Sequence, residues 1–156
     1  MFNERQTIFL IWCTILNQRD KGDRIIKNTY ELMRRLNIQD TLDAFYDISM
    51  ENVEDAFSLK PVTHCFPNVM TSHIWSSIMI LRTIEIKDIF ANIKNYHELD
   101  QRLIIFRGIG KHKIRVLCEI LNFLGMDIEP VGTFSCTALY DAFPLYIHYL
   151  EKLEGK

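Results

Sequence analysis

Apolar side chains recur at intervals of three and four residues along most of this chain, and that spacing is what most constrains its fold. The clearest case is the apolar helix face that would be formed by Ile114, Leu117, Leu121 and Leu124. The β-branched residues fall within such helical patterns and do not alternate with polar ones, so strands are not indicated. We therefore predict an all-α fold.

The same pattern predicts a series of helices separated by short breaks. Residues 4–17 are apolar on most sides, which indicates a central helix. Ser49 is a suitable N-cap for the fourth helix, although the sequence after it lacks a full capping box. The predicted helices are 4–17, 22–36, 39–47, 50–59, one capped by Asn68, 86–94, 97–105, one after Gly110 that ends at Gly125, and about 134–153 with an interruption at Pro144.

Composition indicates one globular domain over residues 1–156. Apolar residues make up 48% of the chain, charged residues make up 24%, and no Pro/Gly/Ser-rich linker divides it. The net charge is −2, which counts against tight nonspecific binding to nucleic acid and requires any basic surface to be local.

Cysteine usage predicts a reducing, cytoplasmic setting. The four cysteines are scattered, and Cys13 and Cys118 fall in apolar helical patterns typical of buried thiols. The apolar run at 7–16 is ten residues long, too short to span a bilayer, and no signal-peptide cleavage site follows it. We therefore expect no membrane association.

No metal or cofactor is predicted. The chain has no Cys-x-x-Cys pair, so neither a zinc knuckle nor an iron–sulfur cluster is indicated. His64 and Cys65 are adjacent in the sequence and cannot easily converge on one ion. We assign structural roles to these two residues and to His73.

The segment from Phe106 to Ile114 (FRGIGKHKI) predicts a tight turn between two helices, within a hairpin at about 97–124. Its glycines allow a sharp turn and close approach of a ligand to the backbone, and the outgoing helix begins with unpaired, positively polarised amides. Basic side chains stand beside them, and Ile109 is expected to tuck back and lock the helices together. The predicted phosphate-binding residues are Arg107, Gly108, Ile109, Gly110, Lys111, His112 and Lys113.

This turn resembles the helix-hairpin-helix motif, and a second segment extends the resemblance. Residues 9–36 are similar to the early helices of the endonuclease III and adenine glycosylase superfamily, in which an apolar helix ends in a Leu-x-x-Gln-type turn. Leu16, Asn17 and Gln18 stand at that turn here. The resemblance implies an endonuclease III-like helical fold that binds intact or damaged duplex DNA, with Asn17 and Gln18 at the DNA and Gln18 filling the gap left by a flipped base.

The catalytic residues of that superfamily do not carry over. The lysine that attacks the sugar in its bifunctional members corresponds to His112, for which we favour a phosphate contact over a general base. The aspartate that acts in base excision corresponds to Gly132, which can neither carry charge nor accept a proton. Asp127 and Glu129 are weak candidate replacements, since both are also typical of a solvated loop.

Three functions remain open from the sequence. The first is a DNA-binding protein of the glycosylase superfamily, inactive or atypical in base excision. The second is an active monofunctional glycosylase of base-excision repair, which needs a carboxylate from Asp127, Glu129 or Asp141. The third is a protein-interaction module that kept the fold and lost DNA. The oligomeric state, lesion and pathway are not indicated.

Overall fold

Seven α-helices and two short 3₁₀ helices make up the described part of the chain, which comprises residues 1–18, 22–132 and 137–155, with backbone alone at 137–140. A single isolated β-bridge, between Asn95 and Glu129, occurs in these ranges, and no strand does. The fold is therefore all-α, as the sequence predicts. The elements are α1 (Glu4–Leu16), α2 (Gly22–Arg35), η1 (Phe45–Asp47), α3 (Met50–Ser58), α4 (Pro67–Leu81), η2 (Ile86–Asp88), α5 (Tyr96–Leu103), α6 (Lys111–Phe123) and α7 (Thr137–Lys152).

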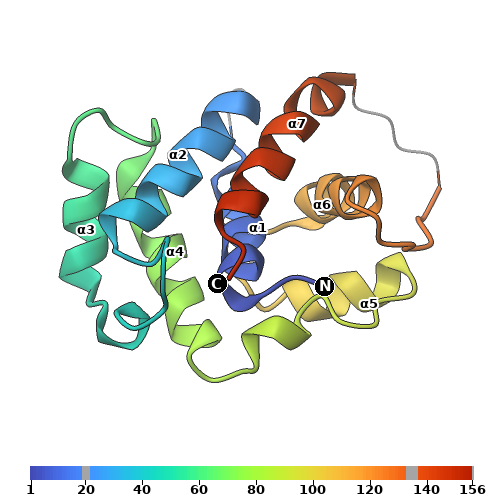
Figure 1. The fold of residues 1–156 in the computed structure, drawn as a ribbon, viewed down its shortest axis with the longest axis horizontal. Coiled ribbons are helices and arrows are strands. Elements are labelled where there is room, and N and C mark those ends of the chain that lie inside the picture. Colours follow the sequence, from blue (N-terminus) through green and yellow to red (C-terminus); the bar gives the residue numbers. More distant parts are fainter. Residues whose placement is uncertain (19–21, 133–136, 156) are drawn as a thin grey trace.

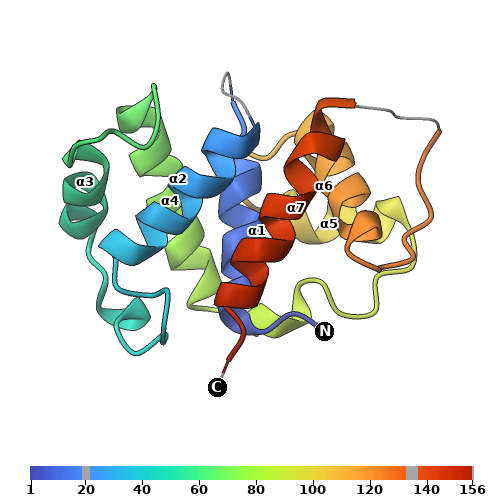
Figure 2. The same ribbon diagram turned by 45° about the horizontal axis from the view of Figure 1, so that its top comes forward.

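Helix α1 is the centre of the molecule. Helices α2, α4 and α6 all pack against it, and every residue of α1 from Gln6 to Leu16 is buried. Helix α3 packs on α4 on one side, α5 packs on α6 on the other, and α7 lies alongside α2 (Figures 1 and 2). A helix that is apolar on most sides thus occupies the position with neighbours on most sides.

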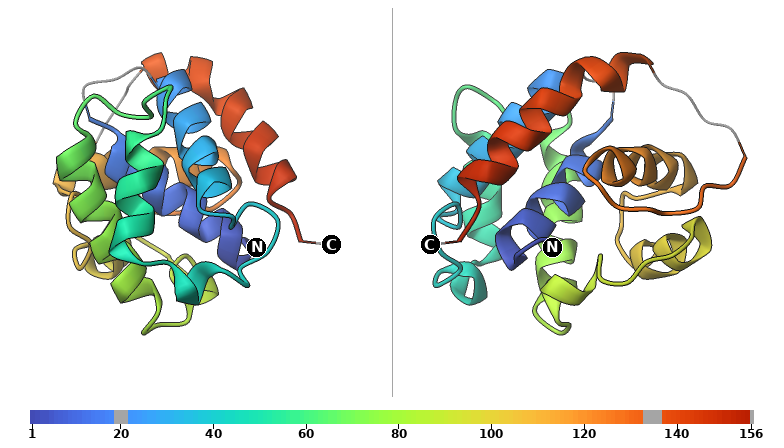
Figure 3. Two further views of the ribbon diagram at one scale, coloured as in Figure 1. Left: turned by 90° about the vertical axis from the view of Figure 1, so that its left-hand side faces the viewer. Right: turned by 45° about the vertical axis from the view of Figure 1, so that its right-hand side comes forward.

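Both ends of the described chain meet beside the start of α1 (Figure 3). Asn3 caps α1 by accepting a hydrogen bond from the Gln6 amide, and Gln6 completes a capping box. The same two side chains also donate to the end of the chain, Gln6 Nε2 to the Leu150 carbonyl of α7 and Asn3 Nδ2 to the carbonyl of Leu153 just after it, each at 2.8 Å. These bonds fix α7 along α1 and α2. No helix in the described ranges has the length and apolar character needed to cross a membrane.

Two predicted short helices are wrong. Residues 39–47 contain only the 3₁₀ turn η1, and residues 86–94 contain only η2. In both places an arginine from another element satisfies the carbonyls that a longer helix would have used. Arg82 donates to the carbonyls of Phe45 and Ile48, and Arg102 donates to three carbonyls between residues 88 and 91.

Helix ends also differ from the predictions at three positions. Asn52 takes the place of the missing Glu or Gln and completes a capping box with Ser49. Helix α4 starts at Pro67 with Phe66 as N-cap, so Asn68 lies within its first turn. Pro144 does not interrupt α7, because the buried Phe143 and Tyr146 on either side of it hold the helix against the core.

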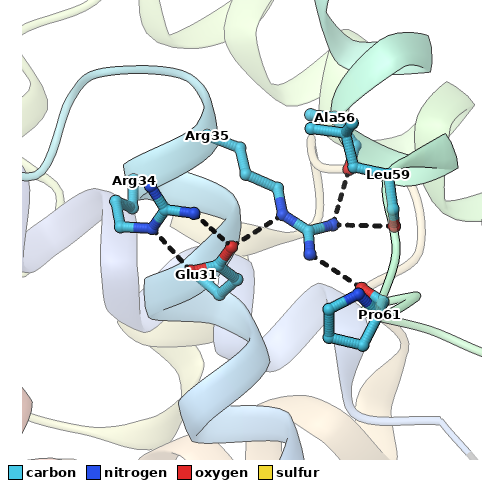
Figure 4. A network of polar contacts seen from close by, with 6 residues as sticks. All are labelled: Glu31, Arg34, Arg35, Ala56, Leu59 and Pro61. Carbon is cyan, nitrogen blue, oxygen red and sulfur yellow. Dashed lines mark hydrogen bonds and ion pairs between the residues drawn. The ribbon is translucent and has the colours of Figure 1, made fainter.

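A polar network ties the end of α2 to the segment after α3 (Figure 4). The Glu31 carboxylate accepts hydrogen bonds from Arg34 and Arg35 at 2.7 and 2.8 Å. The Arg35 side chain is only 3% exposed and also donates to the carbonyls of Ala56, Leu59 and Pro61. Glu31 therefore orients the arginine that holds these two segments together.

We expect Glu31→Gln to destabilise the protein by about 1 kcal/mol at neutral pH, since a partly exposed charged network loses its acceptor charge. Hydrogen bonds from Arg34, and next from Arg35, lower the pKa of Glu31 to about 2 from an ordinary 4.5. The ionised Glu31 carboxylate therefore stabilises the folded protein above pH 4.5, and this stabilisation disappears as pH falls towards 2. Urea unfolding of both proteins between neutral and acid pH tests this, and a difference that does not change with pH would contradict it.

Candidate functional site

The predicted hairpin is present as two helices joined by a seven-residue turn, 104–110, which we call the hairpin turn. Gly108 has φ +87°, a conformation that glycine adopts at little cost. A Cβ atom at Gly108 would lie 2.8 Å from Cδ2 of His73, so the turn also passes too close to α4 for any side chain. Ile109 is buried, as expected for a residue that locks the two helices together.

The N terminus of α6 is open to ligands. Its N-cap is Gly110, no side chain caps it, and a Cβ at Gly110 would meet no atom within 4 Å. The side chains of Arg107, Lys111 and His112 are exposed around it. An uncapped helix N terminus with the exposed cations Arg107 and Lys111 beside it favours an anion such as a backbone phosphate.

Lys113 points into the protein rather than towards solvent. Its Nζ donates to the carbonyls of Ile15 and Gly108, both at 2.8 Å. Burial lowers the pKa of Lys113 to about 8. The side chain therefore connects the hairpin turn to the last turn of α1, and we refer to these two hydrogen bonds as the Lys113 clasp.

The end of α1 is held from a second direction by His64. Its Nε2 lies 3.0 Å from the Leu16 carbonyl, and its Nδ1 accepts a hydrogen bond from the Phe66 amide. Both bonds fit the tautomer that carries its proton on Nε2. Beyond this anchored end, Asn17 is half-buried and Gln18 is exposed. Gln18 thus stands three residues beyond the Ile15 carbonyl, which Lys113 joins to the hairpin turn.

His73 on α4 also contacts the hairpin turn. We call the hairpin turn, the end of α1 and His73 together the junction. The sequence does not predict this contact of His73. Its ring packs on Gly108, and its Nδ1 is buried without a hydrogen-bond partner in the described structure. Burial, together with the charges of Arg107 and Lys113, lowers the pKa of His73. The His73 ring that packs on Gly108 is therefore preferentially neutral. The only signal for this contact is spatial, because His73 and Gly108 are far apart in the sequence.

No hydrogen bond in the described ranges joins the candidate carboxylates to the hairpin turn. Asp127 and Glu129 are exposed in the loop after α6. The Glu129 backbone pairs with the segment before α5, and Asp141 is exposed on α7. Gly132 has φ +68° in the same loop. The residues after it, 133–136, lie outside the described ranges.

The cysteines and histidines of the described ranges do not form a metal site. No three residues drawn from His, Cys, Asp and Glu gather there as ligands. Cys13 and Cys118 are buried, as predicted, and Cys65 is exposed. Desolvation raises the pKa of Cys13 to about 12, so this thiol stays protonated. Cys136 lies outside the described residues.

Comparison of the chain with models of protein families, with curated proteins and with solved structures finds no match. Functional inference therefore rests on the geometry of the hairpin turn and the end of α1.

Proposed function

We propose that this protein binds duplex DNA through the α5–α6 hairpin and places Gln18 at a distorted or abasic position, without excising a base. The observation that carries the proposal is the Lys113 clasp. It joins Gly108 of the hairpin turn to Ile15 near the end of α1. These are the two segments in which the sequence resembles DNA glycosylases. A phosphate-binding turn and an exposed amide side chain then act on the same stretch of DNA.

The charge distribution supports a local rather than a general interaction. The net charge of −2 gives no overall attraction to DNA, while Arg107, Lys111 and His112 are exposed around the uncapped end of α6. Two or three neutralised phosphates per complex correspond to a salt dependence with a slope of about −2 to −3 on a log–log plot. Such a protein binds weakly to ordinary duplex and needs a second contact for selectivity.

The catalytic positions support binding without excision. Gly132 has no ionisable group, and Asp127 and Glu129 are exposed in the loop after α6, where the Glu129 backbone pairs with the segment before α5. An active glycosylase is the alternative. Incubation with duplexes that carry uracil, oxidised, alkylated or mismatched bases tests it, and release of any base would replace our proposal with that one.

Fluorescence anisotropy with two short duplexes, one intact and one carrying a stable abasic-site analogue, tests the binding proposal. We expect salt-sensitive binding between about 50 and 200 mM salt and tighter binding to the abasic duplex. Absence of binding to both at low salt would overturn the proposal. In that case the turn would serve packing alone. The next measurement would be a search for a stable protein partner, or for self-association in sizing experiments.

We expect Gln18→Ala to remove the preference for the abasic duplex while leaving binding to intact duplex unchanged. The Gln18 side chain is exposed, so its truncation costs little stability, but it removes the group that would fill the gap. The expected loss is about three- to tenfold in the abasic-to-intact ratio, the value of one or two hydrogen bonds. Asn68→Ala, an exposed amide in the first turn of α4, is the matched control. An equal loss for both duplexes would contradict the assigned role.

A further inference from the structure

A cavity of about 320 Å³ lies between the start of α5, one face of α6 and the loop at 130–132. Arg115 and Glu119 line it from α6, at positions roughly 200–240° around the helix from Lys113. Because Lys113 points to α1, the cavity opens on a different side of α6 from Gln18. It is therefore separate from the proposed DNA-binding junction.

Arg115 and Glu119 stand at the i, i+4 spacing at which helical ion pairs often form. Their polar groups have different surroundings. The Tyr96 hydroxyl donates to the Lys111 carbonyl at 3.2 Å. Burial raises the pKa of Tyr96, and the nearby Arg115 guanidinium acts against that rise. One carboxylate oxygen of Glu119, Oε2, is buried and has no hydrogen-bond partner in the described structure. A buried carboxylate oxygen without a donor is costly, so this acceptor indicates a missing donor.

The walls of the cavity are held in place by the protein itself. The Asn122 side chain donates to the Ile128 carbonyl at 2.9 Å and accepts from the Ile128 amide at 2.7 Å. The bridge between Asn95 and Glu129 fixes the other end of the same loop. Pro130, Val131 and the Tyr96 ring also line the cavity and give it an apolar part. A lining that combines an aromatic ring, apolar side chains and two charged groups suits an aromatic ligand with polar edges.

We propose that this cavity binds a guanine base. Guanine presents donors at N1 and N2 for the Glu119 carboxylate, and acceptors at O6 and N7 for the Arg115 guanidinium. Its ring would lie between Tyr96 and the apolar wall. Adenine lacks the N1 and N2 donor pair and carries an amino group where guanine has O6, so it cannot pair with both charged residues in this arrangement. Two sources present this chemistry, a free guanine nucleoside or nucleotide and an unpaired guanine in DNA.

Calorimetric titration of the full chain with guanosine, adenosine and cytidine tests this proposal. We expect saturable binding of guanosine and at least about tenfold weaker binding of the other two, since a wrong base leaves a charged group unpaired. Glu119→Gln should weaken guanosine binding about tenfold, and Asp127→Asn, an exposed carboxylate on the neighbouring loop, should leave it unchanged. No saturable guanosine binding, or equal binding of all three nucleosides, would overturn it.

A second titration distinguishes the two sources of guanine. Duplexes with a single extrahelical guanine or cytosine are compared by anisotropy on wild type and Glu119→Gln. A preference for the guanine bulge that Glu119→Gln removes assigns the cavity to a base in DNA. Equal affinity for both bulges, with guanosine binding intact, assigns it to a free guanine compound. The guanosine titration contains no DNA, so its result stands even if the hairpin fails to bind DNA.

Discussion

Gly108→Val is expected to lower affinity for duplex DNA at least about tenfold at low salt and to destabilise the protein by about 1–3 kcal/mol. Valine at φ +87° is strained, and its Cβ would lie 2.8 Å from the His73 ring. Either the His73 ring or the hairpin turn must therefore shift, and relief of the backbone strain at Gly108 displaces the N terminus of α6 with Arg107 and Lys111. Anisotropy with intact and abasic duplexes measures the loss of binding, and urea unfolding measures the loss of stability.

Gly125→Val is the matched control. Gly125 also has a left-handed φ, +103°, but a Cβ there would meet no atom within 4 Å, and it lies at the other end of α6. This variant should lose stability from backbone strain and keep its DNA affinity. If both variants lost affinity in proportion to stability, the hairpin turn would have no special part in binding. Unchanged DNA affinity in a folded Gly108→Val protein would contradict the proposal that the hairpin turn binds DNA.

The fold could be predicted where local pattern and tertiary packing agree. Apolar spacing placed α1, α2, α3, α5 and α6 within a few residues of their observed bounds, because each of these helices buries the face that its own sequence defines. The failures at 39–47 and 86–94 have one cause. Arg82 and Arg102 supply hydrogen bonds to those backbones from other elements, and a local pattern carries no information about such donors.

The site divides in the same way. The chemistry of Gly108, Gly110 and Ile109 is local, so the turn and the open end of α6 were predictable from the sequence. The direction of the Lys113 side chain was not, because its acceptor on α1 lies 98 residues away along the chain. From the sequence, a lysine in the first turn of a helix is expected to face solvent and to contact phosphate. Only the placement of α1 beside α6 makes it an internal hydrogen-bond donor.

Lys113→Met is therefore expected to act on the junction rather than on charge attraction. Methionine fills similar space but cannot donate to the carbonyls of Ile15 and Gly108, so Gln18 and the hairpin turn are no longer held together. We expect the preference for the abasic duplex to be lost as in Gln18→Ala, a fall of up to about tenfold, because both segments lose their relative position. Lys111→Met, which removes an exposed charge two residues away, should weaken binding to both duplexes equally and reduce the salt slope by about one.

The pH dependence of stability separates this role from a phosphate contact. The pKa of Lys113 is about 8 in the folded protein and 10.5 ordinarily, so above pH 8 the folded protein has released a proton that the unfolded chain still holds. The free energy of unfolding of wild type should then rise relative to Lys113→Met by about 1 kcal/mol between pH 7 and 9. Cys13 acts in the opposite direction above pH 9 in both proteins, because burial raises the pKa of its thiol to about 12, so it cancels in the difference. A difference that is flat with pH would place the Lys113 ammonium in solvent, free to contact phosphate, and would remove the clasp on which the proposed function depends.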